Sequence, residues 1–335
     1  METARAVRAI KDLVADTSRV LILTHNNPDP DAVAAAFGLK ALVEAFGPRA
    51  VIGYGGIIGR AENRAMVKQL RIQMFPMDMV DPEEHDVVAV VDAQPSGGNT
   101  PFGQKMRTDI VIDHHPLREG MPDVQVLDVR EEYGATSTII TGYLHMASVE
   151  WDENLATALF YGIKSDIGDL SRDSTRADHL AMRMLFPTIS HNLLTRIERP
   201  RIPAAHFLAL RDAIGNVQIF DDVLVCDLGT VDSPDMIAEM ADDFLRLKGI
   251  LWTMCLGECD GKLNFSLRAL LHGSIAGPVA ERLLQGVGSG GGHDRSAAGT
   301  MLLPEDEEAR REIKAQLIER FLQALDRQNA EGRYL

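Results

Sequence analysis

The chain has 335 residues, 45% of them hydrophobic, and a formal net charge of −15 at pH 7. Its length predicts two domains, and its hydrophobic content is ample for ordinary globular cores. The acidic balance argues against a broad basic surface that tracks a long nucleic acid. A small phosphate ligand, held by metals and a few arginines, stays compatible with that balance.

Features of membrane and secreted proteins are missing from the sequence. No apolar run approaches the roughly 18 residues that a membrane-spanning helix needs, and residues 1–8 lack the apolar region of a signal peptide. The three cysteines, Cys226, Cys255 and Cys259, do not form the framework of a disulfide-rich secreted domain. We therefore expect a cytoplasmic protein without a membrane partner.

The first half of the chain alternates apolar runs of strand type with helical patterns. Strands are predicted at residues 19–24, 50–54, 86–92, 109–113 and 124–128, and helices at residues 3–15, 32–46 and 154–164, with another helix beginning near residue 134. This alternation favours an α/β fold with a mostly parallel sheet and helices on both of its faces. The unbroken apolar run between Asp86 and Asp92 is typical of a buried parallel strand.

Residues 187–203 interrupt this pattern, because three prolines fall there among arginines and polar residues. Beyond them, strands are predicted at 223–228, 250–256 and 262–268, helices at 204–214, 235–247, 275–284 and 305–325, and a glycine-rich turn at 286–292. We therefore expect an N-terminal domain at residues 1–190, a linker at 191–216 and a smaller C-terminal α/β domain at 217–335.

Acidic and imidazole side chains follow several of the predicted strands and one helix. They are His25, Asp29 and Asp31, then Asp92, then Asp113, His114 and His115, and finally Asp166. Carboxyl ends of parallel strands share one sheet edge, where open α/β sheets bind ligands, so these groups are expected to meet. Oxygen ligands with imidazole suit Mn²⁺ or Mg²⁺, and two such ions can activate a water. For residues 25–31 alone, a polar turn with an Asp helix cap is an equally good interpretation.

In these residues the chain resembles the DHH phosphoesterase superfamily. The matching motifs are His25-Asn-Asn-Pro-Asp-Pro-Asp31, Asp92, Asp113-His-His115 and Asp166. A second stretch, Gly290-Gly-Gly-His-Asp-Arg-Ser-Ala-Ala-Gly299, is similar to the glycine-rich signature of the DHHA1 domain. The two signatures extend from residue 20 to residue 300, and their order and spacing resemble those of the compact NrnA-type oligoribonuclease/pAp phosphatases, where pAp is 3′-phosphoadenosine 5′-phosphate.

The resemblance implies a site for two Mn²⁺ ions, with Mg²⁺ as the other option. One ion would be held by His25, Asp29 and Asp92, and the other by Asp31, Asp92, His114 and Asp166, so that Asp92 bridges them. His115 would contact the substrate phosphate or assist the leaving oxygen, and the alternative is a histidine simply satisfied by hydrogen bonds. Asp113 would orient the neighbouring imidazoles.

The resemblance also implies a phosphate grip in the second domain. Arg268, Gly290, Gly291, Gly292 and His293 would hold the far phosphate of a nucleotide. Glycines let backbone N–H groups approach a phosphate closely, and an arginine fork can bind two of its oxygens. The alternative for the glycine run is a flexible loop.

These features predict a Mn²⁺-dependent phosphoesterase for short oligonucleotides, dinucleotides such as pApA, or pAp. A RecJ-like exonuclease on single-stranded DNA is the first alternative, but that family usually carries additional DNA-binding domains, for which 335 residues leave no room. An exopolyphosphatase and a non-catalytic nucleotide sensor are further alternatives. Oligomeric state is not readable, and a homodimer stays among the options.

Overall fold

The computed structural model describes residues 2–97, 99–101, 106–168, 174–202, 204–271, 274–292 and 295–335. The chain divides into two compact units, residues 1–201 and residues 202–335. Two helices occupy most of the expected linker: α7 (His191–Glu198) contributes Ile197 to the core of the first unit, and α8 (Ala204–Ile214) belongs to the second.

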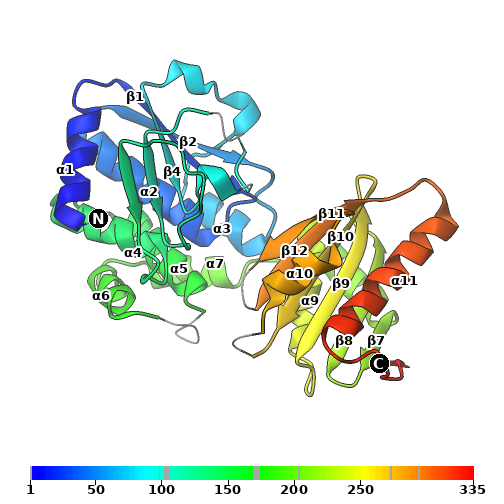
Figure 1. Ribbon diagram of the computed structural model, residues 1–335. Helices are drawn as coiled ribbons and strands as arrows, with labels where there is room; N and C mark the ends of the chain where they lie inside the picture. The colour runs from blue at the N-terminus through cyan, green and yellow to red at the C-terminus, as the bar shows by residue number, and fades with distance from the viewer. Residues whose placement is uncertain are drawn as a thin grey trace. The chain divides into compact units, whose positions relative to one another are not determined.

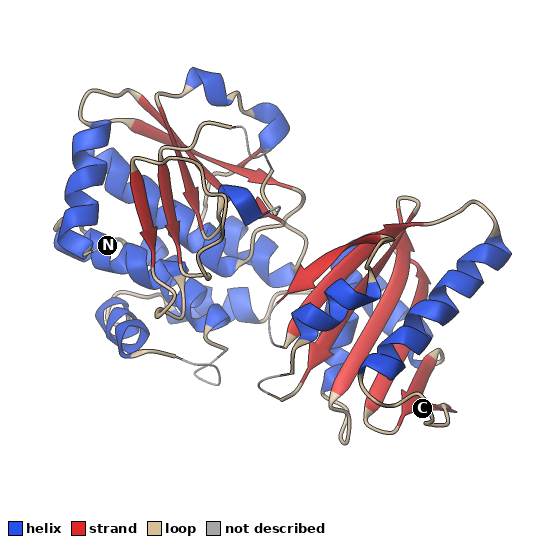
Figure 2. Cartoon of the chain, in the orientation of Figure 1, coloured by secondary structure: helices blue, strands red, loops and turns tan. Residues whose placement is uncertain are grey.

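The first unit is built on a sheet of six parallel strands (Figures 1 and 2). In chain order they are β1 (Arg19–Asn26), β2 (Arg49–Gly55), β3 (Phe75–Pro76), β4 (Val87–Val91), β5 (Ile110–Asp113) and β6 (Val126–Val129). Their order across the sheet is β3-β2-β1-β4-β5-β6. The strands β1 and β4 therefore lie at the centre of the sheet. The strands that follow β1 (β2 and β3) lie on one side of this pair, and the strands that follow β4 (β5 and β6) lie on the other. Ligands of such sheets bind at the carboxyl ends of the two strands where the direction reverses.

Helices lie on one face of this sheet, some in contact with its strands and others packed on those helices. They are α1 (Thr3–Val14), α2 (Pro30–Phe46), α3 (Ala61–Gln69), α4 (Thr136–Met146), α5 (Glu153–Asp166), α6 (Arg176–Leu185) and α7. Strand residues such as Ile22 and Ile112 share one buried cluster with helix residues such as Leu39, Ile139 and Leu159. Burial of these side chains is the main source of stability for the unit.

The opposite face of the sheet differs from the prediction of helices on both faces. Leu21, Leu23 and Val90 pack there against Met77 and Met121, which come from loops and short 3₁₀ turns. The crossing segment around residues 76–84 contains Pro76 and Pro82, which interrupt regular helix and leave only the turns Met77–Met79 and Pro82–Glu84. The predicted α/β class with a flanked parallel sheet is confirmed, but the two-sided helical cover is wrong for the described residues.

The second unit contains a seven-stranded sheet. Its strands are β7 (Val217–Phe220), β8 (Val223–Thr230), β9 (Trp252–Cys259), β10 (Lys262–Ala269), β11 (Gly288–Gly292), β12 (Ser296–Leu302) and β13 (Arg333–Tyr334), in the order β11-β12-β10-β9-β8-β7-β13. Among the strand pairings that the described residues form in this sheet, only that of β8 with β9 is parallel. Helices α10 (Ala276–Leu283) and α11 (Glu307–Ala324) share a core with one face, and α8 and α9 (Pro234–Leu245) with the other. The predicted smaller α/β unit is therefore present.

The glycine-rich stretch at residues 286–292 was expected to be a turn, and that prediction is wrong for its larger part. Gly288–Gly292 form the edge strand β11, which pairs with β12 and packs against α10. A Cβ at Gly290 would lie 2.6 Å from the Leu284 side chain and 2.7 Å from the Ala298 carbonyl oxygen. Glycine is needed here for close packing of a strand, which a sequence pattern does not distinguish from a turn.

Candidate metal centre

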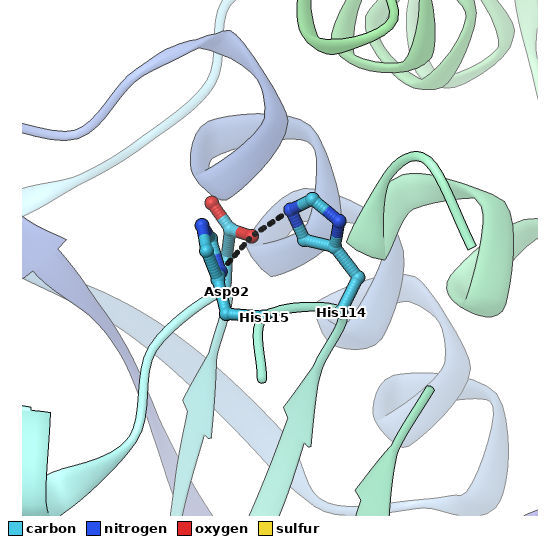
Figure 3. Close-up of side chains that lie close together, drawn as sticks. All are labelled: Asp92, His114 and His115. Carbon is cyan, nitrogen blue, oxygen red and sulfur yellow. Dashed lines mark ion pairs between the residues drawn. The ribbon is translucent and has the colours of Figure 1, made fainter. Parts of the chain in front are cut away.

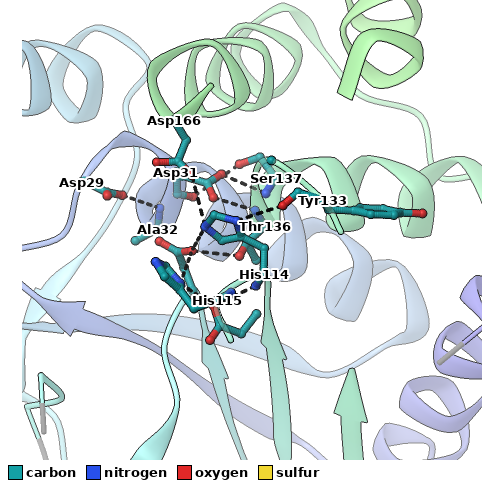
Figure 4. A network of polar contacts seen from close by, with 12 residues as sticks. Asp29, Asp31, Ala32, His114, His115, Tyr133, Thr136, Ser137 and Asp166 are labelled. Atoms are coloured by element: carbon teal, nitrogen blue, oxygen red, sulfur yellow. Dashed lines mark hydrogen bonds and ion pairs between the residues drawn. The ribbon is translucent and has the colours of Figure 1, made fainter. Parts of the chain in front are cut away.

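The six residues predicted as metal ligands meet at the carboxyl edge of the first unit's sheet. Figure 4 shows four of them, Asp29, Asp31, His114 and Asp166. His25 lies near the end of β1, Asp29 and Asp31 at the start of α2, Asp92 directly after β4, His114 directly after β5, and Asp166 at the last residue of α5. The reversal point between β1 and β4 lies among them. The sheet order therefore explains why residues separated by 141 positions (His25 to Asp166) lie together.

One group of ligand atoms forms around His25. Its Nε2 lies 3.8 Å from Asp29 Oδ1 and 3.6 Å from Asp92 Oδ2. Asp29 also begins α2, because its Oδ1 accepts a hydrogen bond of 3.0 Å from the Ala32 N–H. The helix-cap interpretation of this motif is thus correct for Asp29, and the same carboxylate lies within ligand distance of the imidazole.

A second group forms around His114. Its Nε2 lies 3.1 Å from Asp166 Oδ2 and 3.6 Å from Asp92 Oδ1. Asp31 joins His114 and Asp166 in a group whose ligand atoms all lie within 4.8 Å of one another. The two oxygens of Asp92 therefore face different groups, Oδ2 toward His25 and Oδ1 toward His114.

Asp92 has an unusual backbone conformation as well as a central place. Its φ of 56° lies in the left-handed region, which costs energy for a residue with a Cβ but is tolerated best by Asn and Asp. Its side chain is only 2% exposed, and its Oδ1 accepts a hydrogen bond of 2.8 Å from Thr136 Oγ1. The strained turn after β4 thus places one buried carboxylate between the two groups.

Asp31 is held by the first turn of α4. Its two oxygens accept hydrogen bonds from the N–H groups of Thr136 (2.6 Å) and Ser137 (2.9 Å), which are unpaired within the helix and favour an anion. Close packing of α5 fixes this arrangement, since a Cβ at Gly162 would lie 2.7 Å from Ser137 Oγ and 2.8 Å from Ala34 Cβ. The free N–H groups at the start of this helix thus hold the carboxyl group of Asp31.

Asp113 and His115 form a separate pair beside the two groups. Asp113 Oδ1 lies 2.9 Å from His115 Nδ1 and also accepts hydrogen bonds from the N–H groups of His114 and His115. Its Oδ2 accepts a hydrogen bond of 2.7 Å from Gln94 Nε2. Asp113 therefore fixes the loop that carries both histidines, and His115 Nδ1 lies 3.9 Å from Asp92 Oδ1 (Figure 3).

Two residues of this network, Gln94 and Thr136, were not predicted as site residues. Gln94 lies two positions after Asp92, in the loop that follows β4, so its place after a predicted strand was a usable signal. The hydrogen bond between Thr136 and Asp92 could not be predicted from the sequence. The two residues are 44 positions apart, and one lies at the start of a helix while the other follows a strand.

Buried carboxylates raise the pKa of the imidazoles among them. Burial alone would lower the pKa of His114, but Asp166, Asp92 and Asp31 raise it to about 11. Burial likewise opposes the charged form of His25, whose pKa is nevertheless raised well above its ordinary value by Asp29 and Asp92. The cluster therefore attracts positive charge strongly.

The pKa values of two carboxyl groups also indicate that the site would bind positive charge. Burial, together with the charges of Asp92 and Asp166, raises the pKa of Asp31 well above its ordinary range, and burial is also the main cause of the raised pKa of Asp92. Divalent cations would supply the missing charge, and a set of carboxylate oxygens and imidazoles is suited to Mn²⁺ or Mg²⁺. All three cysteines lie in the second unit, so no thiolate competes in this site.

The residues expected to grip a phosphate all lie in the second unit. Arg268 is 8% exposed, and its Nε donates a hydrogen bond of 2.5 Å to Asp242 Oδ1. Its Nη1 donates to Ser266 Oγ (2.7 Å) and to the Leu267 carbonyl (2.9 Å). Gly290, Gly291 and Gly292 belong to β11, and His293 lies outside the described residues. Arg268 is thus already engaged by an acidic partner in its own unit.

Fold and site together define an α/β domain with a carboxylate–imidazole centre of the kind that binds divalent cations, at the reversal point of a parallel sheet. Residues 19–163 match the N-terminal domain of the DHH family, so the first unit carries a DHH-family domain.

The curated relatives extend this likeness beyond that domain. An uncharacterized protein of Methanocaldococcus jannaschii is 35% identical over 305 residues, covering 89% of this chain and 62% of the relative. A cyclic-di-AMP phosphodiesterase, GdpP of Geobacillus thermodenitrificans, is 25% identical over 87% of this chain and 46% of its own. The chain thus spans about half to two thirds of these two relatives. The bifunctional oligoribonuclease and PAP phosphatase NrnA of Thermus thermophilus is 24% identical, with 84% of each chain covered.

Solved structures show the same fold. An exopolyphosphatase-related protein from Bacteroides fragilis superimposes with a TM-score of 0.74 at 16% identity, over 96% of this chain and 98% of that one. RecJ from Thermus thermophilus, solved with Mn²⁺, gives a TM-score of 0.54 at 13% identity, over 96% of this chain and 55% of that one. In the part of the chain that the structure describes, no helix is both long enough and apolar enough to cross a membrane.

Proposed function

We propose that the chain is a divalent-metal-dependent phosphoesterase that hydrolyses short oligonucleotides, pApA-type dinucleotides or pAp. The observation that carries the proposal is the position of Asp92, whose two oxygens face the His25 group and the His114 group from one buried side chain. Such a carboxylate suits a pair of cations that share one ligand. The activities named for GdpP and NrnA support a phosphate ester of a nucleotide as the substrate.

The assignment of ligands follows the two groups. His25, Asp29 and Asp92 would hold one ion, and Asp31, Asp92, His114 and Asp166 the other. Manganese is proposed for both because RecJ, a structure of the same fold, was solved with Mn²⁺, and Mg²⁺ is the second choice. When bound, two such ions lower the pKa of a water and neutralise the charge of phosphate oxygens.

The protein's own groups would prepare the ester for attack. Thr136 and the first turn of α4 fix Asp92 and Asp31, so the ligands need little rearrangement. Asp113 accepts a hydrogen bond from His115 Nδ1, which keeps a proton on that nitrogen and fixes the plane of the ring. His115 would contact the substrate phosphate or donate a proton to the leaving oxygen.

Other functions have some support. The Bacteroides fragilis structure is named as exopolyphosphatase-related, which favours inorganic polyphosphate as a second candidate substrate. A RecJ-like exonuclease is disfavoured by the net charge of −15, because each neutralised phosphate of a long strand needs a basic partner. A nucleotide sensor would bind the same ligands without releasing phosphate.

A substrate panel tests the proposal. The full chain would be assayed with pAp, pApA, short RNA, short DNA, polyphosphate and pyrophosphate, in Mn²⁺, in Mg²⁺ and in a chelator. We expect turnover of the short nucleotides in Mn²⁺ and none in the chelator. Binding without phosphate release or strand cleavage, for every compound, would move the conclusion to a sensor. A homodimer and a cytoplasmic location remain predictions.

A further inference from the structure

The turn between the proposed ligands His25 and Asp29 is bonded to the segment that follows β2. The Asn27 N–H donates a hydrogen bond of 2.9 Å to the Gly55 carbonyl, and Asn27 Oδ1 accepts one of 2.9 Å from the Ile57 N–H. Asn27 has a φ of 54°, in the left-handed region that asparagine tolerates better than most residues. The connection from β2 to α3 therefore supports the turn that joins the two ligands.

Asn63, on α3, adds a side-chain contact to the same turn. Its Nδ2 donates a hydrogen bond of 3.1 Å to the Pro28 carbonyl. Asn63 is only 6% exposed, and Pro28 is buried as well. Removal of the amide would leave this carbonyl buried without its donor, which is costly. Because Pro28 directly precedes Asp29, the bond fixes the chain one residue away from a proposed ligand.

Asp29 depends on this support more than the other two ligands of its group do. Its side chain is 47% exposed, whereas those of His25 and Asp92 are 14% and 2% exposed. Close packing therefore restrains His25 and Asp92, but much of Asp29 faces solvent. The hydrogen bond from the Ala32 N–H orients the Asp29 carboxylate relative to α2. The turn before Asp29 must then set where that carboxylate lies relative to His25.

We propose that Asn63 is a positioning residue, which holds Asp29 where it can share a cation with His25. The inference rests on the proposed function for the presence of two ions. Asn63 acts only through the Pro28 carbonyl. The other ligand group has a separate support, because Asp31 is held by N–H groups of α4. Loss of the Asn63 amide should therefore weaken one ion and leave the other unchanged.

A titration of the metal-free full chain with Mn²⁺ tests this role without requiring turnover, with electron paramagnetic resonance reporting the free ion at each step. The wild type should bind two ions. Asn63→Leu should keep one of them at the wild-type affinity and bind the other about tenfold more weakly, as is typical when a supporting partner of a ligand is lost. Asn63→Ala, which lacks the donor and adds no bulk, should show the same selective loss.

Met66→Ala is the matched control. Met66 is fully buried on the same helix, so this variant loses core packing but keeps the Asn63 amide. Urea unfolding should show that it is less stable than the wild type, while both of its Mn²⁺ affinities stay unchanged. A general loosening of α3 would instead weaken ion binding in the control and in the Asn63 variants alike.

Four results would overturn the proposal: fewer than two ions in the wild type, unchanged affinities in both Asn63 variants, equal weakening of both ions in them, or the same selective loss in Met66→Ala. Hydrolysis of bis(p-nitrophenyl) phosphate, a small generic diester, and of the substrate panel separates this question from the proposed function. Selective loss of one ion in a chain whose wild type hydrolyses no ester would reject the phosphoesterase and keep the positioning role. Hydrolysis by the wild type with unchanged affinities in the Asn63 variants would do the reverse.

Discussion

Thr136 Oγ1 donates a hydrogen bond of 2.8 Å to Asp92 Oδ1, and this bond links the first turn of α4 to the carboxylate between the two ligand groups. The same residue's N–H holds Asp31. One threonine thus orients a proposed ligand of each ion, through its side chain in one case and its backbone in the other.

Removal of the Thr136 hydroxyl should therefore weaken metal binding. Thr136→Val keeps the shape of the side chain and its backbone N–H, but Asp92 loses its donor. Loss of such a supporting bond typically costs about 10- to 100-fold in metal affinity. Thr136→Ser, which retains the hydroxyl, should stay near the wild type. Titration of the metal-free protein with Mn²⁺, followed by electron paramagnetic resonance, measures the difference.

Asp92→Ala should abolish hydrolysis and reduce the occupancy of both ions, because one carboxylate faces both groups. Elemental analysis after dialysis gives the number of Mn²⁺ per chain. Asp16→Ala serves as a surface control and should retain both ions and activity. Two tightly held ions and near-normal turnover in the Asp92 variant would reject the bridging assignment.

The raised histidine pKa values predict how the stability of the metal-free protein depends on pH. The folded state keeps a proton on His114 up to a pKa of about 11, whereas the unfolded chain loses it near 6.5. This contribution is fully present below about pH 6.5 and is lost as the pH rises toward 11, and His25 acts in the same direction. Urea unfolding in a chelator should therefore show a declining free energy of unfolding across this window.

A matched variant separates this effect from general alkaline denaturation. His114→Asn removes a group that holds its proton up to a pKa of about 11, so the decline between pH 7 and pH 10 should become shallower. His145→Asn, on the surface of α4, provides the control and should leave the slope unchanged. Identical slopes for all three proteins would reject the proton-binding explanation.

Two predictions concern Arg268, because it is a proposed anchor for a phosphate and also forms an ion pair with Asp242. Arg268→Ala should destabilise the chain by about 1–2 kcal/mol, since the ion pair is half exposed on the Asp242 side. An anchoring role predicts in addition a KM for pAp raised roughly ten- to hundred-fold, with little change for bis(p-nitrophenyl) phosphate. Asp242→Asn is the comparison: it should share the loss of stability but not the selective change in KM.

The acidic chain also predicts a preference for short substrates. Extra nucleotides must lie on a molecule whose net charge is −15, so kcat/KM should fall as an oligonucleotide grows from about two to about ten residues. Salt screens this repulsion, and the fall should be gentler at high ionic strength. Competition between a labelled dinucleotide and a decanucleotide at two salt concentrations measures the effect. Better turnover of the decanucleotide would favour the RecJ-like alternative.

The sequence predicted the parts of the fold that depend on local pattern. Apolar runs located five of the strands of the first sheet, and the rule that parallel strands share a carboxyl edge brought His25, Asp92 and His114 together before any coordinates. The two-residue strand β3 and the loops that cover the second face were beyond such patterns, because nothing in their periodicity marks them.

The remaining differences come from long-range packing. The close packing of β11 against α10 and β12 requires its glycines. The local sequence pattern around these glycines does not show which elements pack against them. The partners Thr136 for Asp92 and Asp242 for Arg268 are 44 and 26 positions away. Their contacts follow from how helices pack on the sheets, which residue spacing alone does not determine.

The grip of α4 on Asp31 makes two backbone amides reporters of the metal centre. The N–H groups of Thr136 and Ser137 are bonded to Asp31 rather than to a helix carbonyl, so they exchange with solvent only when that contact opens. Cations that bind Asp31 would resist this opening, and hydrogen–deuterium exchange at these two positions would slow as Mn²⁺ is added. Hydrogen–deuterium exchange at these two amides would thus report the occupancy of the ligand group that contains Asp31.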